Sequence, residues 1–103
     1  MSLTCSVFGT LPNGTEVSAY TLKNATGTAL TVTPYGCRIL RLLTPDRNGR
    51  FGDVVLGHAT LEEYLGPNFQ GTFVGRYANR IGGASLTIDG ATYALDKNDG
   101  ENT

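Results

Sequence analysis

The chain has 103 residues with 8 basic and 9 acidic side chains, which gives a formal net charge of −1 at neutral pH. This length corresponds to one domain or to a piece of a larger one. The near-zero charge argues against nucleic-acid and anionic-membrane partners, since both require a basic face. No apolar run approaches the roughly 20 residues that span a bilayer.

The two cysteines and the start of the chain bear on its compartment. Cys5 and Cys37 could form at most one disulfide. Because free cysteine is commonly buried as a small apolar side chain, we expect both to be free and in the core. The first residues show neither the basic nor the apolar segment of a signal peptide. A reducing, cytoplasmic location is therefore expected.

The first half of the chain has the composition of a β-protein. β-Branched and aromatic residues fill most apolar positions, and Gly and Asn recur at short intervals. In chain order the pattern predicts strands at residues 3–9, 15–23, 28–33 and 38–44, with turns at residues 12–14, 24–27 and 45–49. The strand at 38–44 is apolar enough that we expect it to be covered on both faces, apart from Arg41.

The middle of the chain carries the only helical signal. Residues 53–57 predict a short buried strand. Thr60 and Glu63 then have the spacing of a capping box, which predicts a helix of a turn or two over residues 61–65. Gly66-Pro67 would end it.

The last predicted element is a hairpin around the two-residue turn Asp89-Gly90. Such a turn fixes the register of the flanking strands, residues 85–88 and 91–95. The pairing then puts four side chains on one face, which we expect to be buried: Leu86, Ile88, Ala91 and Tyr93.

Few residues have the spacing of a catalytic or cofactor site. His58 is the only histidine, and it lacks the cysteine or second histidine of an ordinary metal site. Acid–base work by His58 is possible, but a structural role is favoured. The Gly-rich stretch 71–77 lacks the Gly-Lys-Ser/Thr end of a phosphate loop. We therefore expect no metal site and no cofactor in this chain.

Residues 76–81, Arg-Tyr-Ala-Asn-Arg-Ile, leave two interpretations open. The segment could be a solvated bend whose arginines bond to backbone carbonyls. Alternatively, it could bind a polyol, because Asn79 offers a donor and an acceptor and Arg80 a rigid fork of donors for vicinal hydroxyls.

The sequence resembles the aldose 1-epimerase (galactose mutarotase) family along nearly its whole length. The Gly-Arg-Tyr-Ala-Asn-Arg-Ile motif at 75–81, followed by a hairpin and an Asn-rich loop, is the most specific match. The other matching stretches, in the same order and spacing, are residues 11–17, 33–39, 45–49, 53–57 and 61–64.

The resemblance implies an all-β fold. Residues 1–103 would be the N-terminal segment of a single large, mostly antiparallel β-sandwich with one short helix, about a third of a family member. The remainder of the polypeptide or another copy would cover the strand edges. Asn79 and Arg80 match family residues that line the sugar site. The family's catalytic histidines and glutamate would lie beyond Thr103, and the position of His58 is usually aromatic.

The function implied is mutarotation of free aldohexoses such as galactose and glucose. One base takes the proton of the C1 hydroxyl and one acid protonates the ring oxygen, so the ring opens and recloses. Two other readings remain. The chain could belong to a non-catalytic sugar-binding relative or a hexose-phosphate epimerase of the same fold. It could also be a small β-sandwich interaction module, although the tryptophan of immunoglobulin-type domains is absent.

Overall fold

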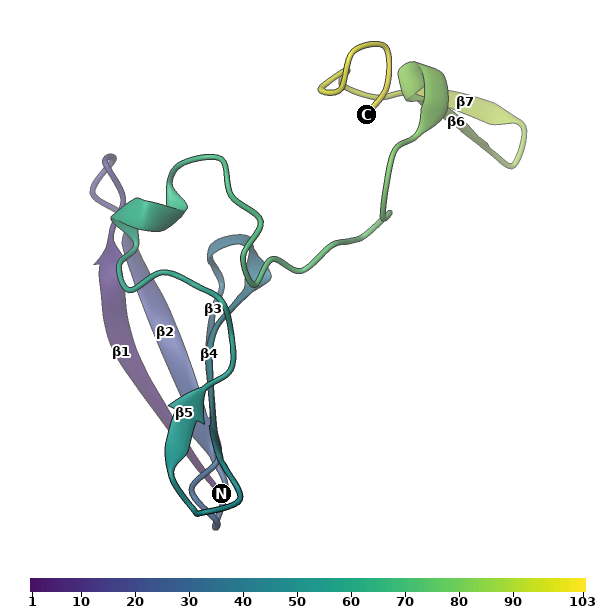
Figure 1. Cartoon of the computed structure of the whole chain (residues 1–103). Coiled ribbons are helices and arrows are strands. Elements are labelled where there is room, and N and C mark those ends of the chain that lie inside the picture. The colour runs from purple at the N-terminus through teal and green to yellow at the C-terminus, as the bar shows by residue number, and fades with distance from the viewer. The chain divides into compact units, whose positions relative to one another are not determined.

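The computed structural model describes all 103 residues, and the chain forms two compact units, Met1–Phe73 and Val74–Thr103 (Figure 1). Both are built from antiparallel strands and single turns of 3-10 helix, so the predicted β class is confirmed. None of the helical turns is long or apolar enough to cross a lipid bilayer.

Unit 1 is a five-stranded antiparallel meander in the order β1-β2-β3-β4-β5. Four strands lie within two residues of their predicted bounds, but the fifth was misplaced. It covers Phe51–Asp53 because the turn after β4 continues directly into pairing of Pro45 with Phe51. The bounds are β1 Ser2–Thr10, β2 Glu16–Lys23, β3 Ala29–Thr33, β4 Arg38–Pro45 and β5 Phe51–Asp53.

The three turns of this meander share one construction. Each ends in a glycine with positive φ: 85° at Gly14, 95° at Gly27 and 78° at Gly49. In the second and third turns, the Oδ1 atoms of Asn24 and Asp46 also accept backbone N–H bonds from within the turn. The predicted turns are confirmed, and their chemistry is local.

One face of the sheet is apolar and uncovered. Registered neighbours point to the same side, and this side carries two rows of four side chains. All eight are at least partly exposed; Leu3 reaches 64% and Ile39 41%. The prediction that β4 is covered on both faces is therefore wrong: one of its faces is exposed. The rows are Leu3–Leu22–Leu30–Leu42 and Cys5–Tyr20–Val32–Ile39.

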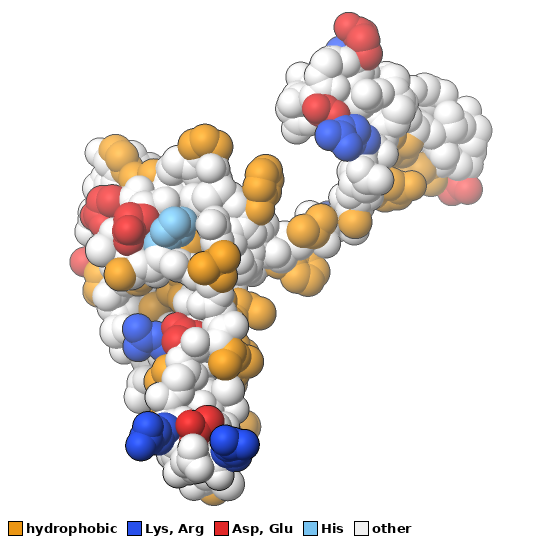
Figure 2. Space-filling model, in the orientation of Figure 1, with side chains coloured by type: hydrophobic (Ala, Val, Ile, Leu, Met, Phe, Trp, Pro, Cys, Tyr) orange, Lys and Arg blue, Asp and Glu red, His pale blue; other side chains and the backbone are white.

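The cysteines were also misjudged. Both are free, but both are exposed. Cys5 lies on the uncovered face, and Cys37 ends the 3-10 turn η1, Tyr35–Cys37. Hydrophobic side chains lie on the surface of both units (Figure 2), and neither cysteine belongs to the buried cluster of unit 1.

The opposite face holds the small core of unit 1. Ala19, Leu40 and Tyr64 pack together there, and Leu61 is fully buried beside them. The predicted helix is only one 3-10 turn, η2 (Glu62–Tyr64), with Gly66-Pro67 after it. Half of the capping box forms, because the Glu63 carboxylate accepts the Thr60 N–H at 3.0 Å.

Arg38 anchors the loop after η2 to this face. Its Nη1 donates to Asn68 Oδ1 at 2.7 Å and to the Gln70 carbonyl at 3.0 Å, and its guanidinium lies 5.1 Å from the Tyr64 ring centroid. An arginine that bonds to carbonyls thus occurs in this chain, but at Arg38.

Unit 2 contains the 3-10 turn η3 (Gly82–Ala84), β6 (Ser85–Ile88) and β7 (Ala91–Ala94). The predicted register is confirmed, and Asp89 and Gly90 both have positive φ, as a two-residue hairpin turn requires. The expected burial was wrong: Ile88 is 55% and Tyr93 52% exposed. Two short strands offer no second layer to cover that face.

Candidate functional site

The two residues predicted to bind sugar lie in unit 2, in the irregular segment that leads into η3. Asn79 has a φ of 66°, a left-handed conformation that asparagine tolerates better than most residues. Arg80 follows it, outside any strand or helical turn. Both residues are exposed, so their polar groups face solvent.

Arg80 forms an ion pair that sequence spacing did not reveal. Its Nε donates to Oδ2 of Asp99, 19 residues further along the chain. The Arg80 side chain remains 63% exposed and that of Asp99 47% exposed. The bond uses Nε, so the two terminal amino groups, Nη1 and Nη2, remain available to a ligand.

The loop that carries Asp99 is bound to the segment that follows Arg80. Ile81 and Thr103 exchange two backbone hydrogen bonds, with N···O distances of 2.7 and 3.3 Å. Asn102 Oδ1 accepts the Gly83 N–H at 3.0 Å. These three bonds join residues about 20 positions apart and bring the motif and the Asn-rich loop together.

The loop is also closed on itself. The Asp99 N–H donates to the Asn102 carbonyl and the Asn102 N–H returns a bond to the Asp99 carbonyl, both at 3.1 Å. Gly100 turns the chain between them with a φ of 63°. Asp99 is therefore presented by a closed loop rather than by a free end.

The other members of the predicted cluster do not join this arrangement. Arg76 is exposed and makes no side-chain hydrogen bond or ion pair, and Tyr77 is 73% exposed. The structure thus groups Asn79, Arg80, Asp99 and Asn102. This group can donate to and accept from adjacent hydroxyls, but it holds no acid–base pair.

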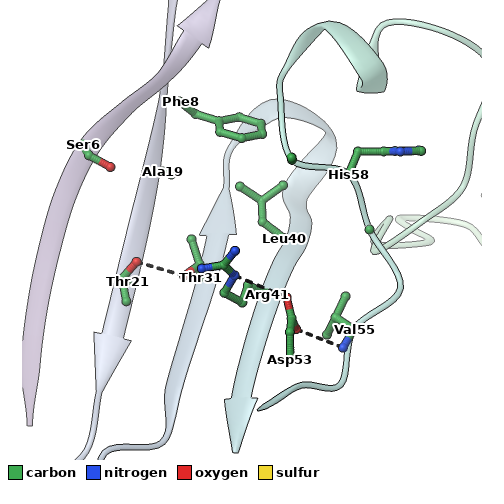
Figure 3. Close-up of a pocket in the computed structure, with 12 residues that line it drawn as sticks. Ser6, Phe8, Ala19, Thr21, Thr31, Leu40, Arg41, Asp53, Val55 and His58 are labelled. Atoms are coloured by element: carbon green, nitrogen blue, oxygen red, sulfur yellow. Dashed lines mark hydrogen bonds and ion pairs between the residues drawn. The ribbon is translucent and has the colours of Figure 1, made fainter. Parts of the chain in front are cut away.

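Apart from this group, a concavity lies on the core-side face of the sheet in unit 1 (Figure 3). Phe8 and Leu40 line its apolar part, and two polar pairs line the rest. Thr21 and Thr31 share a hydrogen bond of 2.9 Å, and Arg41 Nε lies 3.3 Å from Asp53 Oδ2. Sequence reasoning missed these pairs because they join different strands.

Asp53 is the strongest polar anchor in this concavity. Its Oδ1 accepts the N–H groups of Val55 and Leu42, at 3.1 and 3.0 Å. Partial desolvation raises the pKa of Asp53, but those two bonds and Arg41 outweigh it, so the pKa lies below its ordinary value. The carboxylate ties β4 to the chain that leaves β5.

His58 lies at the rim of the same concavity and has a structural environment. Its ring stands edge-on to Tyr64 with centroids 4.9 Å apart. Its backbone N–H donates to Tyr64 Oη at 2.9 Å. In the whole chain, no three His, Cys, Asp or Glu side chains converge to hold a metal ion.

Comparison with known proteins gives a consistent result. The profile described as Aldose 1-epimerase matches residues 18–103. Galactose mutarotase of Sus scrofa is 41% identical over all of this chain and 30% of its own length. Aldose 1-epimerase of Streptococcus thermophilus is 32% identical over 99% of this chain and 29% of its own length.

Comparison with solved structures points to the same family. The crystal structure of galactose 1-epimerase from Lactobacillus acidophilus NCFM matches with a TM-score of 0.75 and 26% identity. The match covers 99% of this chain and 29% of that one. The chain therefore spans about 30% of the length of the relatives it matches.

Proposed function

The chain belongs to the aldose 1-epimerase family, and we propose that the polypeptide that carries it interconverts the α and β anomers of free hexoses such as galactose and glucose. The match spans residues 18–103 and includes the motif at 75–81, which contains Asn79 and Arg80. The observation that carries the proposal is the exposed Arg80, whose terminal amino groups are free while its Nε is anchored.

In this proposal Asn79 and Arg80 orient the sugar. The Asn79 amide can donate to one hydroxyl and accept from another, and the Nη groups of Arg80 form charge-assisted bonds to neighbouring oxygens. Residues 1–103 are then one segment of a single β-sandwich domain. The proposed location of the protein is the cytoplasm. The acid and the base that open the ring come from the histidine and glutamate positions that the family resemblance places beyond Thr103.

The test is polarimetry of freshly dissolved α-galactose with the complete polypeptide. Wild type accelerates the approach to the equilibrium rotation. Arg80→Ala lowers kcat/KM by about 10- to 150-fold, because a hydrogen bond from a charged donor is lost. Unchanged kinetics in a folded Arg80→Ala variant would make Arg80 a purely structural residue.

Two controls separate the alternatives. Arg76→Ala removes a nearby exposed arginine without a partner, and we expect kcat/KM to change less than twofold. Hexose 6-phosphate offered in place of the free sugar reports on a phosphate-specific epimerase. Faster anomerisation of the phosphate than of the free hexose would replace the proposed substrate class.

A further inference from the structure

Asp99 is well placed to control how Arg80 meets its ligand. Arginine has a long flexible stem, and a free side chain samples many rotamers. The bond from Nε to Asp99 Oδ2 restrains that stem at its last flexible position. Neither Nη1 nor Nη2 takes part in this bond, so the donors at the tip of the guanidinium group remain for a ligand.

We propose that Asp99 is a positioning residue that holds the Arg80 guanidinium in the orientation that binds the sugar. This inference rests on the proposed function of Arg80. In this role Asp99 acts through its Oδ2 atom, which is bonded to Arg80 and not to the sugar. Its effect on mutarotation therefore passes through the arginine.

The loop around Asp99 supports this role. Asp99 is closed against Asn102 by two backbone bonds, and Asn102 and Thr103 are bonded to Gly83 and Ile81. The carboxylate is thus fixed to the chain that directly follows Arg80. A group that is fixed in this way can restrain a side chain, whereas one on a free loop would move with it.

Charges elsewhere in the loop do not offer the same contact. Glu101 pairs with Lys97 and is the more exposed partner, with 84% of its side chain accessible. It lies two residues from Asp99 and carries the same charge. It is therefore a matched control for any general electrostatic effect of the loop.

The test is a double-mutant cycle in the complete polypeptide, read as kcat/KM for α-galactose. Asp99→Ala should lower kcat/KM by about 3- to 30-fold, which lies within the range of coupling energies measured for contacting pairs. In the Arg80→Ala background the same change should have no further effect beyond twofold. Glu101→Ala should stay within twofold of wild type, and Asp99→Asn, which keeps an acceptor oxygen, should lose less than Asp99→Ala.

A loss of equal size in both backgrounds would overturn the proposal, because Asp99 would then act on the fold and not through Arg80. So would an Asp99→Ala variant with full activity. The thermal midpoint of each variant shows whether the loop still folds.

A second readout does not depend on activity. In the complete protein, the NMR signal of the Arg80 Nε–H group should shift in Asp99→Asn and stay in place in Glu101→Gln. If the chemical shift of the Arg80 Nε–H signal is unchanged in Asp99→Asn, the positioning role is overturned. If wild type turns over neither hexose nor its phosphate, the proposed function fails, while the NMR result still decides the Arg80–Asp99 pair.

Discussion

Asn79 combines a backbone requirement with a side chain that can contact sugar. Its φ of 66° is favourable for Asn and Gly and costs about 1–2 kcal/mol for an ordinary side chain. Replacing it by Gly removes the amide but keeps the backbone, whereas Ala removes the amide and strains the backbone. The two variants therefore separate the two roles.

We expect Asn79→Gly and Asn79→Ala each to lower kcat/KM for α-galactose by about 3- to 10-fold, the value of a neutral hydrogen bond. Only Asn79→Ala should also lower the thermal midpoint, by a few degrees. Polarimetry and a thermal melt of the complete protein measure both. An Asn79→Gly variant with wild-type kcat/KM would mean that the amide does not contact the sugar.

Asp53 gives the clearest pH dependence at this scale. Its pKa is lowered in the folded protein, so the charged carboxylate stabilises the fold. This contribution is fully present above the unfolded value, near 3.9 for Asp, and is lost as the pH falls through the lower folded pKa. Protonation removes the pair with Arg41 and weakens the bonds from Leu42 and Val55.

The corresponding variant is Asp53→Asn. At pH 7 we expect it to lower the free energy of unfolding by about 1 kcal/mol, a value reduced for the solvent that screens this partly exposed pair. Below the folded pKa the difference from wild type should disappear. Urea unfolding over a series of pH values from 7 down into the acid range tests this, with Glu16→Gln at the start of β2 as the control. A difference that stays constant with pH would contradict the ionic role.

At the scale of elements, the backbone of the loop after η2 approaches β4 most closely at Gly71. The Gly71 carbonyl accepts the Ile39 N–H at 2.8 Å. A Cβ built on Gly71 would lie 2.0 Å from the Ile39 carbonyl oxygen, and the φ of 64° would strain it further. Only glycine allows this contact, which Arg38 reinforces from the neighbouring position.

Gly71→Ala should therefore lower the free energy of unfolding by at least about 2 kcal/mol, since a backbone contact must open. Gly52 in β5 is the matched control, because a Cβ there meets nothing within 4 Å. Gly52→Ala should raise stability by up to about 1 kcal/mol through the entropy of the unfolded chain. Equal effects of the two variants in chemical denaturation would show that the loop is not held at Gly71.

At the scale of the whole molecule, the uncovered apolar face of the sheet is the dominant feature. Two rows of apolar side chains cross four strands with no second layer over them, and β1 leaves a nine-residue edge unpaired. Faces and edges of this kind associate with other chains. We propose that the remainder of the polypeptide, or another copy, covers them.

Residues 1–103 produced alone should consequently bind an apolar dye, sediment as more than a monomer at micromolar concentration, and show no mutarotase activity. Leu22→Lys on the uncovered face should weaken the association, and Thr21→Lys on the opposite face should not. A monomer with a cooperative melt and no dye binding would favour an autonomous interaction module.

Local chemistry explains why so much of the architecture was predictable. The glycine turns, the first four strands and the Asp89-Gly90 register each depend on a few neighbouring residues, and all were confirmed. The family resemblance also came from contiguous motifs and is borne out over residues 18–103. The short strand β5 was misplaced because its prediction relied on the apolar residues at 53–57. The preceding turn instead starts the pairing with β4 at Phe51.

Contacts between distant residues could not be derived in this way. The Arg80–Asp99 and Arg41–Asp53 pairs join residues 19 and 12 positions apart, and the folded backbone alone brings them together. Burial was misjudged at β4, at both cysteines and at the last hairpin for a related reason. An apolar pattern indicates which side chains would be stabilised by burial. Whether they are buried is decided by the arrangement of layers in space, because another layer must pack over them.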